Sequence, residues 1–342
     1  MILFDARNYY SNGGIGEYTR NILHELIKIY PNRLIVLCKS NIPLESCHKL
    51  IIPFPFVLSN WVVNSILFAS YLKRRGFWPL TYFSPIISSV HNSISSQVVV
   101  VHDVPPTHAL NYHMPSNIFS KNIPLLYNAS KIICISESTK KQLLSIDPVL
   151  EFKSFVVKNG ISCPGISYQP VDYKILPKSK YICTIGFNPR KNILNLIHGF
   201  NLSSFKNDGG ILVIVGDCLW DASYYQSCID AAKSSSVVFY GNLSDAKKNI
   251  LLSHAQSYIS ASFFEGHGLT IAEASFFSIP LVASDIDAHR EFYNDCAIFF
   301  DPNDINDIAD KIDLSVNVNH TKTCSSIISW KTSCELLVSH LC

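Results

Sequence analysis

The chain has 342 residues, of which 48% are hydrophobic, 12% aromatic and 16% charged, and its net charge is +2. This length exceeds what one hydrophobic core usually supports, so we expect two domains, and the composition excludes a disordered chain. The small net charge excludes the strongly basic balance typical of nucleic-acid-binding proteins, and we expect no nucleic-acid partner.

The first half of the chain alternates apolar runs with amphipathic stretches. A strand is predicted at 2–4, then a glycine loop at 13–16 and a helix at 17–28. Strand, glycine loop and helix together open an α/β unit. Later elements of this half are a helix at 136–144 and strands at 34–37, 97–101, 131–135 and 155–157.

Residues 164–179 interrupt this rhythm with prolines and polar residues, which predicts a linker. The alternation then restarts. Strands are predicted at 181–185, 211–215, 237–240, 257–260 and 281–284. Helices are predicted at 192–200, 224–232, 246–254, 270–277, 305–312 and 330–341.

Two runs of buried strands alternating with helices predict an α/β fold with two doubly wound, Rossmann-like parallel sheets. We expect an N-terminal domain over 1–163, a linker over 164–179, a C-terminal domain over 180–328, and a closing helix over 329–342 that packs back on the N-terminal domain. Ligands of such sheets bind at the carboxyl ends of the strands, so the expected site is a cleft between the two domains.

The 11 cysteines form no CxxC pair, which argues against a zinc or redox motif. We expect reduced thiols in the cytoplasm, with an extracellular disulfide framework as the alternative. No basic segment precedes the apolar start of the chain, and no apolar run is long enough to span a bilayer. We therefore expect a soluble protein without a signal peptide, attached to a membrane at most by its surface.

The strongest candidate site is the segment 265–273, which reads EGHGLTIAE. Its two carboxylates, Glu265 and Glu273, flank two glycines at a predicted helix start. Glycines allow close backbone approach to a ligand, and free N–H groups at a helix start attract phosphate. The alternative is an ordinary loop followed by a helix with acidic residues near its start.

Three further groups lie near predicted strand ends. Arg190 and Lys191 suit a diphosphate, or they form a solvated basic pair. The glycine loop at 13–16 suits a phosphate or a sugar, or it is a tight turn, and it lacks the GxGxxG dinucleotide pattern. His102 could bind a sugar hydroxyl or shuttle a proton, or it caps a strand end.

Together, these segments resemble the GT4 family of retaining glycosyltransferases, which have the GT-B fold. The resemblance covers nearly the whole chain in order. It is carried by 13–20 (GGIGEYTR), 101–106 (VHDVPP), 135–139 (ISEST), 157–161 (VKNGI), 186–192 (GFNPRKN), 265–273, 301–304 (DPND) and 329–330 (SW).

The resemblance implies a role for each candidate residue. The donor diphosphate would contact Gly14, Ile15, Gly16, Arg190, Lys191, Leu269 and Thr270. The transferred sugar and the ribose would contact Glu265, Gly266, His267, Gly268 and Glu273, with Glu273 on the ribose. The catalytic residues would be His102, near the reacting carbon, and Glu265.

The resemblance also implies metal-independent chemistry without a cofactor. The acceptor would attack the face from which the donor phosphate departs, so the anomeric configuration is retained, and the leaving phosphate would take the acceptor proton. Two positions depart from the family, because His267 stands where Phe is usual and Phe187 where Arg is frequent. The His267 ring could place a cation near the sugar or only pack.

The subgroup that the chain resembles is associated with mannose transfer from GDP-mannose in bacterial surface polysaccharide synthesis. We therefore expect a nucleotide sugar as donor and a glycan or lipid-linked glycan as acceptor. Cations beside aromatic residues in 61–85 predict peripheral contact with the cytoplasmic membrane, unless they form a buried helix with a basic end.

Three other functions are weighed against this one. The first is a nucleotide-sugar epimerase or hydrolase on the same fold, and the second is a catalytically inactive binding subunit of a glycan assembly complex. The third, a nicotinamide dehydrogenase, is disfavoured because the GxGxxG pattern is absent.

Overall fold

The chain folds into two compact units in the computed structural model, which describes residues 1–54, 56–78, 80–88, 93–94, 96–105, 116–164, 172–217, 221–233, 236–318 and 324–341. Part of the predicted linker, residues 165–171, lies outside the described residues. The chain passes from the first unit to the second after Gly160 and returns to the first after Ile327.

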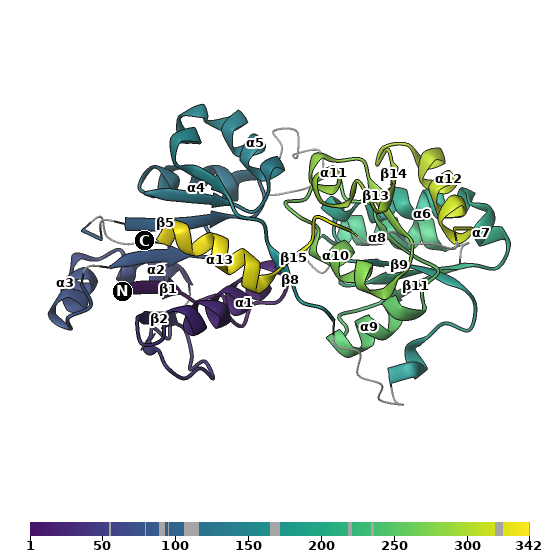
Figure 1. Cartoon of the computed structure of the whole chain (residues 1–342). Coiled ribbons are helices and arrows are strands. Elements are labelled where there is room, and N and C mark those ends of the chain that lie inside the picture. The colour runs from purple at the N-terminus through teal and green to yellow at the C-terminus, as the bar shows by residue number, and fades with distance from the viewer. Residues whose placement is uncertain are drawn as a thin grey trace. The chain divides into compact units, whose positions relative to one another are not determined.

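The first unit is built on a parallel sheet with strand order β3-β2-β1-β4-β5-β6-β7. Its strands are β1 (Ile2–Asp5), β2 (Leu34–Cys38), β3 (His48–Ile51), β4 (Thr81–Ser84), β5 (Ser96–Val101), β6 (Lys131–Cys134) and β7 (Ser154–Val156). The helices of this unit are α1 (Gly14–Ile29), α2 (Phe56–Val63), α3 (Ile66–Arg74), α4 (Ser116–Tyr127), α5 (Glu137–Ile146), the 3-10 helix η2 (Pro148–Lys153) and α13 (Trp330–Leu341). Figure 1 shows α13 lying beside α1.

Apolar spacing explains which faces of these helices are buried. In α1, Tyr18, Ile22, Leu23 and Leu26 recur at helical spacing and are buried in the core of the first unit. The last helix, α13, contributes its Trp330 to the same core. The valines of β5 are buried on both faces of the sheet, as expected for a central parallel strand.

The second unit repeats the plan, with parallel strands in the order β11-β10-β9-β12-β13-β14. Its strands are β9 (Tyr181–Ile185), β10 (Ile211–Val215), β11 (Val237–Tyr240), β12 (Ser257–Ser260), β13 (Leu281–Ser284) and β14 (Ala297–Phe300). The helices are η3 (Asp172–Ile175), η4 (Pro189–Lys191), α6 (Ile193–Leu202), α7 (Ser204–Asn207), α8 (Ala222–Ala232), α9 (Asp245–His254), α10 (Leu269–Ala274), η5 (Ser275–Phe277), α11 (Asp287–Tyr293) and α12 (Ile305–Val316). A separate two-stranded sheet joins β8 (Gly160–Ile161) to β15 (Ile328–Ser329). The predicted class, two doubly wound parallel sheets, is therefore confirmed.

Several elements were not predicted from the sequence, namely β3, β4, β14, α2, α3, α4 and α11. The strands among them are only four residues long, so alternation could not be distinguished from chance. The helix α11 has the sequence DAHREFY, in which polar residues obscure the apolar face. The helix α1 also begins earlier than expected, at Gly14.

One expectation about cysteine is corrected. We expected reduced thiols, but Cys296 and Cys324 form a disulfide with a Cα–Cα distance of 5.2 Å. They are separated by 28 residues and meet only in the fold, so no sequence spacing indicated the pair. Within the described parts of the chain, no helix is both long and apolar enough to cross a membrane.

Candidate functional site

The main candidate site lies where the chain order of the second sheet reverses. From β9 the chain moves outward through β10 and β11, and it then returns to β12 on the other side of β9. The loops after β9 and β12 therefore leave adjacent strands in opposite directions. Open parallel sheets bind their ligands at this point, at the carboxyl ends of the strands.

The loop after β9 carries Arg190 and Lys191 on the short helix η4. The Asn188 side chain caps this helix by accepting a hydrogen bond of 3.2 Å from the Lys191 backbone N–H. The loop after β12 is held against it, because the Phe263 N–H donates to the Arg190 carbonyl at 2.9 Å and Arg190 Nη1 donates to the Phe264 carbonyl at 3.1 Å. These contacts fix both cations beside the second loop.

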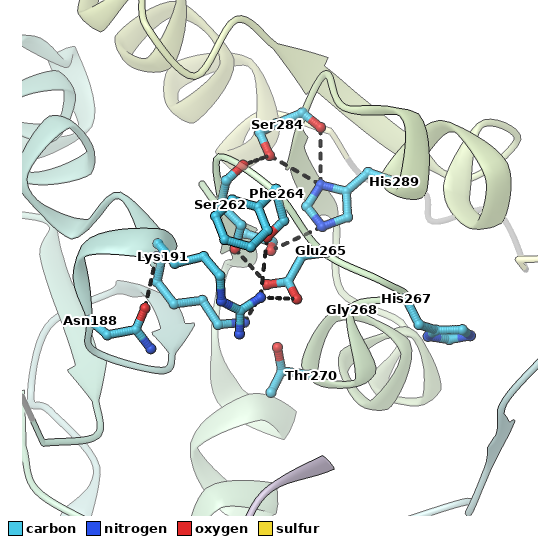
Figure 2. A network of polar contacts seen from close by, with 12 residues as sticks. Asn188, Lys191, Ser262, Phe264, Glu265, His267, Gly268, Thr270, Ser284 and His289 are labelled. Carbon is cyan, nitrogen blue, oxygen red and sulfur yellow. Dashed lines mark hydrogen bonds and ion pairs between the residues drawn. The ribbon is translucent and has the colours of Figure 1, made fainter. Parts of the chain in front are cut away.

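Glu265 receives both cations (Figure 2). Its Oε2 lies 2.5 Å from Arg190 Nη1, and its Oε1 lies 2.6 Å from Lys191 Nζ and accepts a hydrogen bond of 2.8 Å from Ser262 Oγ. The carboxylate is buried. Burial raises its pKa, but the charges of Arg190 and Lys191 outweigh burial and hold the pKa well below the usual range. Glu265 is therefore an ionised acceptor fixed between two cations.

The turn into α10 requires glycine. Gly268 has a φ of +88° and forms the N-cap of α10, in a region of backbone conformation that side chains disfavour. The next residues, Leu269 and Thr270, begin the helix, and the Thr270 hydroxyl accepts a hydrogen bond of 2.7 Å from Tyr258 Oη. This hydrogen bond joins the start of α10 to β12, the strand that precedes the Glu265 loop.

The His267 ring packs and does not extend toward Glu265. Its centroid lies 3.9 Å from that of Phe292, the side chain is buried, and Figure 2 shows the ring turned away from the Glu265 carboxylate. The Tyr293 hydroxyl donates to the carbonyls of His267 and Gly268, at 3.3 and 2.9 Å. Of the two readings of the sequence, the ring as a packing group agrees with the structure. The backbone role of residues 266–268 stays a prediction.

Glu273 lies one turn into α10 and is only partly buried. Its Oε2 lies 2.9 Å from Lys248 Nζ of α9, and the same ammonium lies 3.1 Å from Asp245. Nothing in the sequence marks Lys248 as a site residue, because a lysine in a polar helix resembles any solvated charge. The ion pair sets the direction in which Glu273 points.

In the first unit, the glycine loop is held tightly at the start of α1. A Cβ on Gly16 would lie 1.9 Å from the Ser11 carbonyl, so only glycine fits there. The Arg20 Nη1 donates to the carbonyls of Tyr9 and Ser11, at 2.8 and 3.2 Å, and fixes the preceding turn. Gly14 begins the helix, and Ile15 is exposed beside it.

His102 follows β5 in the first unit. Its Nε2 lies 2.7 Å from the Pro85 carbonyl, which can only accept, so Nε2 carries a proton and Nδ1 is the acceptor. Burial lowers the pKa of His102, which favours the neutral ring. The Tyr18 ring stands edge-on at 5.0 Å between centroids. A neutral His102 ring can accept a hydrogen bond through Nδ1, and it places no positive charge at this position.

The first unit also contains a buried ion pair that was not predicted from the sequence. Between β1 and β4, where the strand order of that sheet reverses, Arg7 contacts Asp5 through Nη2 at 2.6 Å and Nε at 2.9 Å. Tyr82 Oη donates to Asp5 at 2.7 Å, and Ser59 Oγ accepts from Arg7 Nη1 at 2.8 Å. In the sequence, the only indication of this pair was an acidic and a basic residue directly after the first predicted strand. Its position at the reversal of strand order could not be seen, because β4 was not predicted.

Known proteins are similar to this chain in sequence and in fold. The family model described as glycosyl transferases group 1 matches residues 169–328. The O-antigen chain mannosyltransferase B of Escherichia coli is 24% identical over 254 residues, or 69% of this chain and 66% of that protein. The match thus spans just under two thirds of the relative's length.

Solved glycosyltransferase structures share the fold. A structure of HepE from Anabaena in complex with UDP and glucose has a TM-score of 0.71 and 16% identity, over 99% of this chain and 98% of that one. Sucrose-phosphate synthase from Thermosynechococcus elongatus has a TM-score of 0.73 and 14% identity, over 99% and 97%. Proteins that share little sequence thus share both Rossmann-like sheets with this chain.

Proposed function

We propose that this chain, whose residues 169–328 match the family model of glycosyl transferases group 1, transfers a sugar from a nucleotide-diphosphate donor to an acceptor. The observation that carries the proposal is the convergence of Arg190, Lys191 and Glu265 at the strand ends of the second sheet. Two cations suit a diphosphate, and a fixed carboxylate suits sugar hydroxyls.

The proposed reaction breaks the bond between the sugar C1 and the diphosphate oxygen and forms a bond from C1 to an acceptor oxygen. Negative charge grows on the leaving diphosphate, where Arg190 and Lys191 stabilise it. The leaving phosphate takes the acceptor proton. Attack on the face from which the diphosphate departs gives retention, and no metal ion is required in this scheme. Both points are predictions.

The remaining candidate residues complete the proposal. Glu273 accepts hydrogen bonds from the ribose hydroxyls, in an orientation set by Lys248. The neutral His102 accepts a hydrogen bond from a sugar hydroxyl through Nδ1, and the backbone of Gly14, Ile15 and Gly16 contacts the phosphates. Loop closure over the donor would exclude water from the reacting carbon.

The finer proposal is mannose from GDP-mannose as the donor and a glycan or lipid-linked glycan as the acceptor, in bacterial surface polysaccharide synthesis. The relative named as an O-antigen chain mannosyltransferase supports it. The Anabaena structure holds UDP and glucose, so UDP-glucose is the donor to compare against.

We also propose peripheral contact of the first unit with the cytoplasmic membrane. Part of the segment 61–85 is interior, because Phe68, Tyr82 and Phe83 are buried. The exposed face of α3 still carries Ile66, Leu67 and Tyr71, followed by the exposed cations Lys73, Arg74 and Arg75. Apolar side chains beside cations suit an anionic lipid surface.

The experiment is thermal unfolding and calorimetric binding with GDP-mannose, GDP, UDP-glucose and UDP, with and without EDTA, followed by a transfer assay. One nucleotide family should raise the melting temperature, because a ligand of the native state stabilises it. Glu273→Ala should weaken nucleotide and nucleotide sugar alike, whereas Glu335→Ala on α13 should change neither.

Other outcomes would replace the proposal. Binding of no donor would contradict it and favour the inactive subunit. Sugar released or isomerised without an acceptor would favour the hydrolase or the epimerase. A donor bound only in the presence of a metal ion would contradict metal independence.

A further inference from the structure

His289, which the sequence did not mark as a site residue, is buried beside the loop that carries Glu265 (Figure 2). It belongs to α11, which follows β13. Its ring lies between three segments of the candidate site: Ser260 at the end of β12, Ser284 at the end of β13, and Gly268 at the start of α10.

The contacts fix the tautomer of the ring. Nδ1 lies 3.0 Å from the Ser284 carbonyl oxygen, which can only accept, so Nδ1 carries the proton. Nε2 is then an acceptor, and Ser260 Oγ lies 3.4 Å from it. Burial, with a contribution from the charges of Lys191 and Arg190, lowers the pKa of His289 to about 4 although Glu265 opposes the shift. The ring is therefore neutral near pH 7.

A short chain of contacts leads from this ring to the carboxylate. Ser284 Oγ lies 3.1 Å from His289 Nδ1 and donates a hydrogen bond of 2.5 Å to the Ser262 carbonyl. The Ser262 hydroxyl in turn donates to Glu265 Oε1 at 2.8 Å. The position of Ser284 thus determines where Ser262 holds the carboxylate.

The same ring supports the turn into α10. A Cβ on Gly268 would lie 3.3 Å from His289 Nε2, so the backbone at Gly268 rests close to the ring edge. The His289 side chain therefore lies against both Gly268 at the start of α10 and Ser284, whose hydroxyl binds the Glu265 loop at Ser262.

We propose that His289 is a positioning residue that fixes the Glu265 carboxylate for the transferred sugar, acting through Ser284 and Ser262. This inference rests on the proposed function, in which Glu265 contacts that sugar. A histidine that only fills the core would support all ligands equally. A positioning histidine should affect sugar binding more than nucleotide binding, because the contacts through Ser284 and Ser262 end on the Glu265 carboxylate and include neither Arg190 nor Lys191.

The experiment compares three variants. His289→Leu keeps the bulk and removes the donor, His289→Asn can restore an N–H near the position of Nδ1, and Ser284→Ala removes the hydroxyl link to Ser262 while leaving His289 in place. The exposed His198 of α6 provides the matched control, His198→Asn. Calorimetry compares the affinity for GDP-mannose with that for GDP, and the affinity for UDP-glucose with that for UDP. Hydrogen exchange measures the exchange rates of the backbone amides of residues 262–268 without ligand.

His289→Leu and Ser284→Ala should weaken nucleotide-sugar binding about tenfold, the effect of one buried hydrogen bond, and change nucleoside-diphosphate binding by no more than about twofold. Both should speed exchange in 262–268, and His289→Asn should recover most of each effect. His198→Asn should change nothing.

The role of His289 would be overturned if His289→Leu and Ser284→Ala weakened the binding of nucleotide and nucleotide sugar equally. It would also be overturned if both variants bound ligands and exchanged amides as the wild type does. If His289→Leu does not fold, Ser284→Ala decides the question. If the wild type binds no nucleotide sugar, the proposed function falls. Unchanged exchange in 262–268 would then refute the anchoring by His289 independently.

Discussion

Lys191 Nζ lies 2.6 Å from Glu265 Oε1, although 74 residues separate the two along the chain. They meet because β9 and β12 are neighbours in the sheet while the chain between them runs out through β10 and β11. The pair links the group proposed for the diphosphate to the group proposed for the sugar, so a change at one should be felt at the other.

This coupling predicts opposite effects of Glu265→Gln on two ligands. The amide keeps the size of the side chain but removes the charge that pairs with Arg190 and Lys191. Transfer should fall at least about a hundredfold, because a fixed acceptor of the sugar is lost. Nucleoside-diphosphate affinity should stay the same or rise, because both cations are released from their partner. Transfer kinetics and calorimetry with the nucleotide measure the two effects, and Glu335→Gln controls for charge removal. A parallel loss of both would contradict the separate roles.

The Asp5–Arg7 pair predicts a large effect on stability. Arg7→Met leaves the Asp5 carboxylate buried without its cation, which should lower the free energy of unfolding by about 3–5 kcal/mol. The exposed pair of Asp285 and Arg290 has similar bidentate contacts, at 2.6 and 2.7 Å, so Arg290→Met should cost less than about 1 kcal/mol.

Urea unfolding measures the free energy of unfolding of the Arg7→Met and Arg290→Met variants. The double variant Asp5→Asn with Arg7→Met should recover part of the loss, since no buried charge remains. Equal costs for Arg7→Met and Arg290→Met would show that burial of the first pair does not matter.

The sequence was sufficient for the fold because most strands are continuous apolar runs and the helices between them have clear apolar faces. It was also sufficient to mark Arg190, Lys191 and Glu265 one by one, since each follows a predicted strand. It could not show that they form one ion-paired cluster, because strand order depends on contacts far apart in the chain. The rule that ligands bind at the carboxyl ends of parallel strands indicated the region but not the pairs.

Residues that act through neighbours left no signal in the sequence. No motif surrounds His289 in the sequence of α11. Its proposed role follows from its contacts with Ser260 and Ser284, which lie on two other elements. Lys248 resembles any surface lysine until Glu273 is seen beside it. Conversely, His267 stood in the strongest motif, yet its ring packs on Phe292. Motif position alone therefore does not separate a ligand contact from a packing contact.

The buried His289 predicts a pH dependence of stability. Its pKa is about 4 in the folded chain and about 6.5 when unfolded, so the unfolded chain binds more protons between these values. The free energy of unfolding should therefore fall as the pH drops from about 6.5 to about 4, by up to about 3 kcal/mol relative to His289→Asn. The charged groups facing the ring are Glu265, Arg190 and Lys191, and the cations hold the pKa of Glu265 well below its usual range.

Urea unfolding at pH 4.5, 5.5 and 7.0 tests this dependence. Histidines elsewhere contribute to both proteins, so the difference between wild type and His289→Asn isolates this one. A difference that stays constant with pH would mean that the ring is not held neutral by burial.

The exposed face of α3 predicts binding to anionic vesicles. Leu67 and Ile66 are 78% and 61% exposed, and Lys73, Arg74 and Arg75 follow within the same short segment. Leu67→Glu should weaken binding to vesicles of phosphatidylglycerol and phosphatidylcholine, because it removes apolar contact and adds a repelling charge.

Replacing Arg74 and Arg75 by Gln should weaken vesicle binding by about 1 kcal/mol for each cation, an effect that salt should mask. Leu336 on α13 is 51% exposed and provides the matched control, Leu336→Glu, because its helix has a single lysine, Lys331, and no arginine, and so lacks a cluster of three cations. Sedimentation with vesicles at low and high salt measures all of these variants. If wild type ignores anionic vesicles at low salt, or if Leu336→Glu weakens binding as much as Leu67→Glu, then α3 is not a membrane-contacting face, and its exposed apolar residues need another partner.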